Sequence, residues 1–268
     1  MGKRQAIILG KEISPATTKY IAEIETSLHK PVVYQFTEPK KTKSYGQCDP
    51  WQSEAYYVYC KESLLQVTRK KEINIPFETN LLHELMHLQQ IEEGYPHTAT
   101  LRTAVTAQDP VFWDAMGTLV YSVVMDLNVE YRLNQLGYTS AYFHEQNCIR
   151  AEKDARHGYI FRDEIQFVRM ALQLMGLYLT CPRERMEKVL SIYSKKNQSL
   201  VNCVITISEE ISEIGYSDAE TTFRSLVFLF SAFNLWRSHQ ISFRGKDYRS
   251  VSAVKGDYRD IKILAQEP

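Results

Sequence analysis

Hydrophobic and polar residues at the front of the chain follow first a helical and then an extended pattern. A helix is predicted over residues 17–29, where apolar residues recur at helical spacing before a proline. Two runs rich in Val and Tyr, residues 32–36 and 55–60, predict strands. Residues 37–53 contain Pro, Gly, Lys and Ser and are predicted to form a loop. We therefore expect a small mixed sheet of about three or four strands near the front of the chain.

A second helical pattern follows at residues 81–93. It is preceded by a short alternating run at residues 72–76, which ends at a proline and is predicted to be an edge strand. Thr79 or Asn80 can cap this helix, because their short polar side chains accept hydrogen bonds from the first backbone N–H groups. Gly94, with a proline two residues later, is expected to end it.

Helices are also predicted in the rest of the chain, and beyond Tyr142 the chain is predicted to be almost wholly helical. A long helical pattern covers residues 112–136 and ends at Gly137. Further helices are expected at residues 144–157, 160–180, 182–196, 198–214 and 218–237, separated by breaks at Gly, Pro and Asn. This order of elements predicts a mostly helical α+β fold. Its core would span residues 1–140, and a helical bundle at residues 141–268 would pack on it, either as a separate part or as an extension of the same core.

The charge balance and the cysteine content indicate which partners and which cellular compartment to expect. The chain has 32 Lys and Arg against 32 Asp and Glu, so its mean field attracts neither nucleic acid nor an anionic membrane. Its five cysteines are odd in number and scattered, which argues against a disulfide framework and for a reducing compartment. The apolar runs are too short for a signal peptide or a membrane span. We therefore expect a soluble, cytoplasmic protein with no nucleic-acid or membrane partner.

The helix predicted over residues 81–93 contains the pattern H-E-x-x-H. His83 and His87 are four residues apart, which puts their rings on one helix face with Cβ atoms about 5–6 Å apart. Both imidazoles can then bind one zinc ion at about 2.0–2.1 Å. Glu84 follows the first histidine, so its carboxylate can reach a metal-bound water without being a ligand. Leu and Met surround these three residues, and burying them without a metal or partners would be costly.

With this motif, residues 55–137 resemble the zincin superfamily of metallopeptidases, and within it the thermolysin-related gluzincins. The resemblance implies a zincin-like core, a bound Zn²⁺ and hydrolysis of peptide bonds. In gluzincins an acid on a later helix, in the pattern E-x-x-x-D, supplies the third ligand, and the second acid orients a ligand histidine. This chain has Asp126 and Glu130 at that spacing with the identities reversed. The position favours Asp126 as the ligand and the residue type favours Glu130, so both assignments stay open.

Three other histidines are weaker candidates. His97 follows Gly94 as the third histidine of metzincins follows a glycine, but that glycine comes four residues too late for the metzincin pattern. His97 is therefore expected in a solvated loop. His144 or His157 could stabilise an oxyanion, although a lone histidine more often caps a helix or lies on the surface.

The expected function is that of a zinc-dependent peptidase acting on peptides or proteins, with Glu84 as the general base. Two alternatives remain. The chain could be a non-catalytic regulatory or binding protein on a zincin scaffold, or an intracellular protease that cleaves a single regulatory partner. The sequence leaves the substrate and the oligomeric state open.

Overall fold

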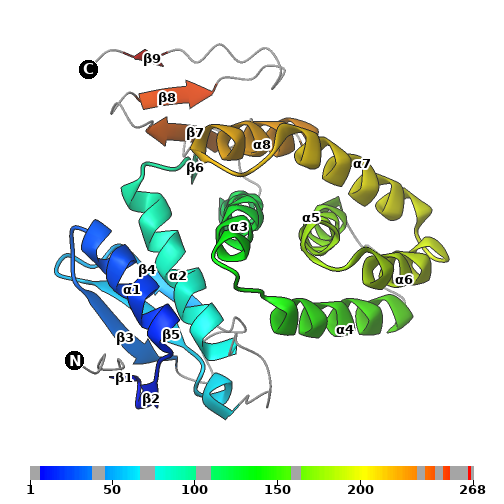
Figure 1. Ribbon diagram of the computed structural model, residues 1–268. Coiled ribbons are helices and arrows are strands. Elements are labelled where there is room, and N and C mark those ends of the chain that lie inside the picture. Colours follow the sequence, from blue (N-terminus) through cyan, green and yellow to red (C-terminus); the bar gives the residue numbers. More distant parts are fainter. Residues whose placement is uncertain are drawn as a thin grey trace. The chain divides into compact units, whose positions relative to one another are not determined.

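The computed structural model describes residues 7–37, 46–66, 76–100, 110–157, 164–233, 239–244, 250–253 and 265–266. These residues form eight α-helices, one short 3-10 helix and nine short strands. The described part of the chain is therefore mostly helical with small sheets, consistent with the predicted α+β class. Contacts divide the chain into two compact units, residues 1–93 with 132–142 and residues 94–131 with 143–268 (Figure 1). The core predicted over residues 1–140 and the bundle predicted over residues 141–268 stay predictions.

The first unit opens with a small hairpin and a capped helix. Strands β1 (Ile7–Ile8) and β2 (Lys11–Glu12) pair antiparallel. Helix α1 (Pro15–Ser27) begins after Ser14, whose side chain accepts a hydrogen bond from the Thr17 backbone N–H. Proline in the first turn suits a helix start, because the first N–H groups have no partner inside the helix. Its buried stripe has helical spacing, which confirms the helix predicted in this region, and consists of Thr17, Ile21 and Ile24.

A three-stranded sheet follows in the first unit. The two Val- and Tyr-rich runs form strands β3 (Val32–Phe36) and β5 (Tyr56–Cys60), as predicted, and these two strands pair in parallel. Strand β4 (Gly46–Asp49) pairs antiparallel with β5, so the sheet has the order β3-β5-β4. The prediction of a continuous loop over residues 37–53 was therefore wrong. The β4 sequence, GQCD, has little strand propensity of its own, and its pairing with β5 decides its conformation.

Helix α2 (Pro76–Glu92) packs against β4, β5 and α1 (Figure 1). It begins earlier than predicted, so Thr79 and Asn80 are not caps but buried residues of its first turns. The edge strand predicted at residues 72–76 falls mostly outside the described residues, and Pro76 itself is the first residue of α2. Gly94 has a φ of 74°, a conformation that favours glycine, and ends the helix as predicted.

The last turn of helix α3 (Pro110–Gln135) also belongs to the first unit. There Arg132 donates a hydrogen bond to the Gln89 side chain, 3.4 Å from Nη1 to Oε1, and forms an ion pair with Glu93. Beyond the helix, Tyr138 and Thr17 share a hydrogen bond of 2.7 Å between their hydroxyl groups. These contacts hold the end of α3 to α2 and α1.

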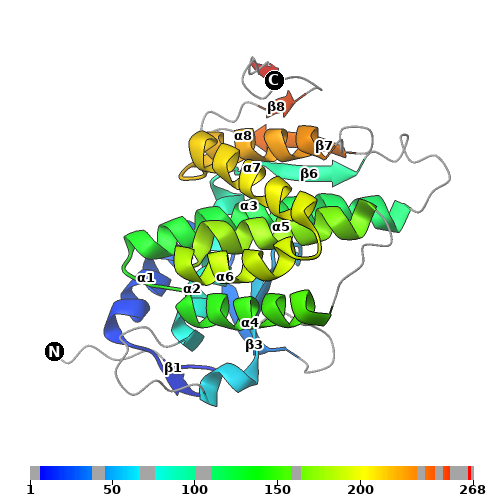
Figure 2. The same cartoon turned by 90° about the vertical axis from the view of Figure 1, so that its right-hand side faces the viewer.

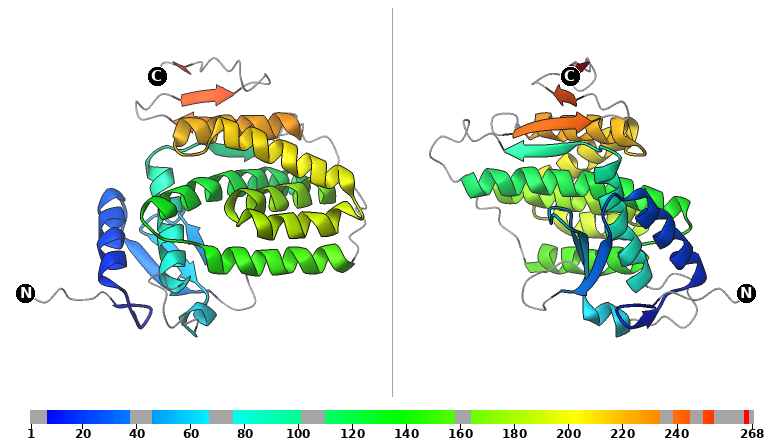
Figure 3. Two further views of the ribbon diagram at one scale, coloured as in Figure 1. Left: turned by 45° about the vertical axis from the view of Figure 1, so that its right-hand side comes forward. Right: turned by 90° about the vertical axis from the view of Figure 1, so that its left-hand side faces the viewer.

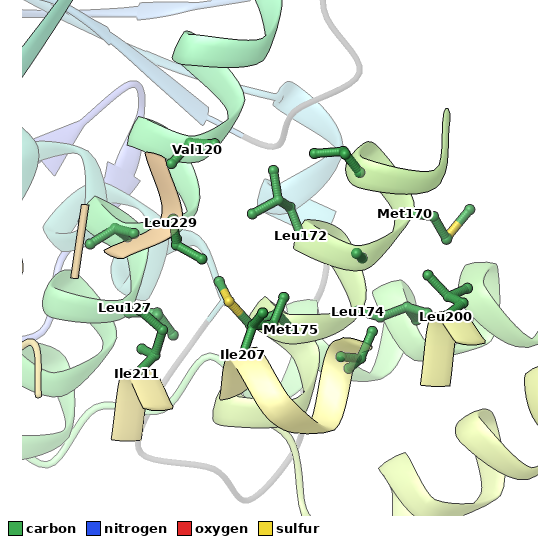
Figure 4. Packing of buried hydrophobic residues seen from close by; sticks show 14 of the residues in the cluster. Val120, Leu127, Met170, Leu172, Leu174, Met175, Leu200, Ile207, Ile211 and Leu229 are labelled. Atoms are coloured by element: carbon green, nitrogen blue, oxygen red, sulfur yellow. The ribbon is translucent and has the colours of Figure 1, made fainter. Parts of the chain in front are cut away.

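The second unit contains a helical core. Its helices are α4 (Ala141–His157), α5 (Glu164–Thr180), α6 (Arg183–Ser194), α7 (Gln198–Ile214) and α8 (Ala219–Ala232), together with most of α3. Helix α5 packs against α7 and α6, and α7 packs against α6 and α8 (Figure 2). The side chains between them are almost wholly apolar, as Figure 4 shows for Leu172, Met175, Ile207 and Leu229 among others. Burial of this apolar area is the main stabilising contribution in the unit.

The second unit also contains a four-stranded sheet, which was not predicted from the sequence. Strands β6 (His97–Thr100), β7 (His239–Arg244), β8 (Ser250–Ala253) and β9 (Ala265–Gln266) pair antiparallel in that order. Strand β7 lies next to α8 (Figure 3). The expectation that the chain beyond Tyr142 is almost wholly helical was therefore wrong at its end. The partner of β7 precedes it by more than 130 residues, so no local pattern signals the pairing.

Candidate metal centre

His83 and His87 lie one turn apart on α2, and their rings converge. Their Nε2 atoms are 3.1 Å apart, and the ring planes meet at 77°. Two nitrogen ligands of a tetrahedral zinc ion, each at about 2.0–2.1 Å, are roughly 3.3 Å from each other. The separation of the two Nε2 atoms is thus close to what a shared metal ion requires.

Gln90 fixes the orientation of the second histidine. Its side-chain oxygen lies 3.0 Å from Nδ1 of His87, and Gln90 is fully buried. An amide oxygen only accepts hydrogen bonds, so Nδ1 of His87 carries the proton that it donates. The lone pair of the neutral ring then lies on Nε2, the atom that points toward His83. Such a partner behind a ligand histidine sets both the tautomer and the direction of the ring.

Glu84 is buried against the sheet of the first unit, with 7% of its surface exposed. Gly46 of β4 approaches it so closely that an added Cβ atom would lie 2.5 Å from Oε1 of Glu84. Burial, and next the Glu84 carboxylate, raise the pKa of the Cys60 thiol to about 12. Asn80 donates a hydrogen bond of 3.3 Å to the same sulfur. Cys60 therefore stays protonated at neutral pH, and the acidic group at this place is Glu84.

The two acids that the sequence offered as third ligands lie on α3, in the second unit. Four residues separate Asp126 from Glu130, so both point to one side of the helix. Glu130 is buried, and its Oε2 lies 3.6 Å from Nε2 of His144 on α4. Asn128, between them in sequence, donates a hydrogen bond of 2.7 Å to the Tyr216 carbonyl. Within this unit, the structure thus brings Glu130 together with His144.

The other candidate histidines have separate places. His97 is in strand β6, so the expectation of a loop there was wrong. His157 is exposed at the end of α4, where its Nδ1 lies 2.7 Å from the Lys153 carbonyl of the preceding turn. This contact satisfies a helix-terminal carbonyl and gives His157 an ordinary structural role.

Two residues of the site were not singled out from the sequence, Gln90 and Gly46. The spacing of His87 and Gln90, three residues apart on one helix, is a local signal that could have identified the first. No local signal identifies Gly46, because it approaches Glu84 only through the packing of β4 on α2.

Comparisons of the chain with protein-family models, curated proteins and solved structures find no match. Within the described residues, no helix combines the length and the apolar character needed to cross a lipid bilayer.

Proposed function

We propose that this protein is a zinc-dependent peptidase in which His83 and His87 hold the metal and Glu84 is the general base. One observation carries the proposal: the Nε2 atoms of the two histidines lie 3.1 Å apart on the helix that also carries a buried carboxylate. Imidazole and carboxylate groups are usual zinc ligands, and a site with three protein ligands keeps a position open for catalysis. A zincin-like core belongs to the same proposal, supported by the packing of α2 on a small mixed sheet.

In this proposal Asp126 is the third ligand. Its place in the sequence matches that of the ligand acid in the gluzincin pattern, and its carboxylate would complete a set of two imidazole nitrogens and one carboxylate oxygen. Glu130 faces His144 instead, which favours a supporting role for it.

In peptide hydrolysis at this site, Glu84 and Gln90 would have different roles. Bound zinc supplies a water of lowered pKa and polarises the substrate carbonyl. Glu84 accepts the proton of the attacking water on its carboxylate and then donates it to the leaving amine. Gln90 keeps the Nε2 lone pair of His87 directed away from the protein backbone and toward the metal position. Since Glu84 is buried, its charge is little screened by solvent and acts strongly on groups close to it.

The position of β4 supports a peptide as the substrate. This strand is at the edge of the described β3-β5-β4 sheet, and its Gly46 lies against Glu84. An edge strand offers backbone N–H and C=O groups to which an extended peptide can add as a further strand. A peptide bound in this way would pass beside the general base.

A pair of variants tests the proposal. The protein is loaded with zinc, freed of excess metal and incubated with a peptide library made from a digested proteome, and new peptide ends are identified by mass spectrometry. Glu84→Gln should retain zinc at the wild-type level while cleavage falls by roughly 10²- to 10⁴-fold. His87→Ala should lose both zinc and cleavage. The matched control is Glu23→Gln, which changes an exposed carboxylate of α1 and should alter neither.

Two results would count against this account. Undiminished cleavage by Glu84→Gln would remove the general base. A wild-type protein that holds zinc and cleaves no peptide would favour the alternative of a binding protein on this scaffold.

A further inference from the structure

Two thiols meet in the second unit, away from the histidine pair of the first. Cys148 lies on α4, and Cys181 follows the last residue of α5, just before α6 begins. Their Sγ atoms are 3.3 Å apart, and both cysteines are free. One of the two thiols therefore donates a hydrogen bond to the other sulfur.

Charged groups surround this pair. Arg185, on the first turn of α6, donates two hydrogen bonds of 3.0 and 3.2 Å to the Glu145 carboxylate and also contacts Glu152. The hydrogen bond from Cys181 lowers the pKa of Cys148 below its ordinary value, and Arg185 lowers it further, against the effect of burial. The same hydrogen bond, together with burial, raises the pKa of Cys181. Of the two thiols, Cys148 is therefore the one that ionises more readily.

We propose that Cys148 and Cys181 form a dithiol site that hydrogen peroxide converts into a reversible disulfide between α4 and the corner joining α5 to α6. The S–S bond is about 2.05 Å long, so the two sulfurs need to approach by only roughly 1.2 Å. Cys181 is half-buried, so a small oxidant can reach the pair from its side and meet the buried Cys148 sulfur 3.3 Å away. This inference does not depend on the proposed peptidase activity.

The oxidation has two balanced steps. The Cys148 thiolate attacks one oxygen of the peroxide, the O–O bond breaks, hydroxide leaves and a sulfenic acid forms on Cys148. The second sulfur then attacks the sulfenic sulfur, the S–S bond forms and the S–O bond breaks. The displaced hydroxyl group leaves as water with the proton of the second thiol. In total the two sulfurs lose two electrons, which the peroxide accepts.

Cys203 and Cys60 are less suited to oxidation by peroxide, because the pKa of each thiol is raised. Burial raises the pKa of Cys203, and the pKa of Cys60 is raised to about 12 by burial and the Glu84 charge. Because the thiolate is the reactive form, both should react more slowly than the pair.

Mass spectrometry tests the site directly. Reduced protein is treated with a small excess of hydrogen peroxide, quenched with an alkylating agent and digested with trypsin without reduction. The intact mass should fall by about 2 Da, the two hydrogens lost. The tryptic peptide of residues 133–150 should be linked to that of residues 170–183. Dithiothreitol should separate the two peptides and restore the mass of the reduced protein. Cross-linking should be at least about tenfold faster than oxidation of Cys203.

Single variants separate the pair from its surroundings. Cys148→Ala and Cys181→Ala should each abolish the cross-link and leave a sulfenic acid, trapped by dimedone, on the remaining thiol of the pair. Cys203→Ser is the matched control and should cross-link like the wild type. The proposal is overturned if peroxide oxidises other cysteines first, if Cys148 and Cys181 acquire separate sulfinic acids without a cross-link, or if neither reacts.

Discussion

The orientation of the His87 ring is set by the uncharged side chain of Gln90. The amide oxygen of Gln90 accepts a hydrogen bond from Nδ1 of His87, which leaves the lone pair of the ring on Nε2, the atom that faces His83. The Nε2 atom of His83 is 3.1 Å from it, so both rings present a nitrogen to the same place. A metal ion bound there needs the lone pair of both Nε2 atoms, so protons compete with it.

Removing the support behind His87 should weaken metal binding without changing the ligands. In Gln90→Ala the ring can rotate and change tautomer, so we expect zinc affinity to fall by roughly 10- to 100-fold. Gln90→Glu keeps an acceptor at the same place and should retain most of the affinity. Competition with a chromogenic chelator measures both, and equal affinity in Gln90→Ala and the wild type would exclude this role for Gln90.

The two acids on α3 should respond differently to loss of charge. Asp126→Asn removes a proposed ligand, so zinc affinity should fall by more than about 100-fold. Glu130→Gln removes a partner of His144 and not a proposed ligand, so the loss should not exceed the roughly 10- to 100-fold typical of a supporting residue. The same chelator competition decides between them, and the reverse order would assign the third ligand to Glu130.

At the scale of elements, the candidate site depends on how closely β4 packs on α2. Gly46 has no side chain, and this absence allows the strand to lie against Glu84 and Asn80. The sequence reveals the residues of α2 because their spacing is local, whereas Gly46 precedes Glu84 by almost 40 residues and carries no motif. Only the fold identifies it as part of the site.

A methyl group at Gly46 should displace the general base. In Gly46→Ala the new Cβ would lie 2.4 Å from Nδ2 of Asn80 and 2.5 Å from Oε1 of Glu84, so both the amide and the carboxylate must move away. A displacement of this kind should lower kcat by roughly 10- to 100-fold with zinc content unchanged. Gly176→Ala is the control, since its Cβ would make an ordinary 3.5 Å contact with Val123 in the other unit. Equal turnover in both variants would mean that Glu84 does not need its present position.

Helices α1 and α2 are joined by a buried carboxylate. Glu78 of α2 accepts hydrogen bonds of 2.9 Å from the Ser14 backbone N–H and 2.7 Å from its hydroxyl, and a further one from Thr17. It thereby caps the start of α1, where backbone N–H groups lack partners and a negative charge is favourable.

Truncation of Glu78 should be costly because it leaves these donors buried without an acceptor. Glu78→Ala is expected to lower the free energy of unfolding by roughly 2–4 kcal/mol. Glu23→Ala, which removes an exposed carboxylate paired with Lys19, should change it by less than about 1 kcal/mol. Urea denaturation followed by circular dichroism measures both, and similar midpoints would contradict the capping role.

At the scale of the whole molecule, the sequence predicted those elements whose start and end are set by residues close by in the chain. Helix α7 has the predicted bounds, 198–214, because Asn197 caps its start and Gly215, with a φ of 88°, ends it. Strand β7 was missed because it pairs with β6, which lies far back in the sequence. Strand β4 was missed because its residues have little strand propensity and its pairing with β5 decides its conformation. The start of α2 was also misjudged, since burial against the sheet extends the helix beyond the polar residues that would otherwise cap it.

The same distinction applies to the candidate site. The pattern H-E-x-x-H lies within one helix, so the convergence of His83 and His87 follows from helix geometry alone. The choice between Asp126 and Glu130 is not local, because it depends on which side chain other helices engage. The contact of Glu130 with His144 joins α3 to α4, two elements that no sequence spacing relates.

The central claim is that His83 and His87 share one zinc ion, and X-ray absorption at the zinc edge tests it most directly. The zinc-loaded protein should contain one zinc per chain, with nitrogen and oxygen ligands at about 2.0–2.1 Å and outer-shell scattering from two imidazoles. His83→Ala should lose the imidazole signal together with tight binding. Zinc that is absent at stoichiometric amounts, or that is bound by sulfur at about 2.3 Å, would contradict the account.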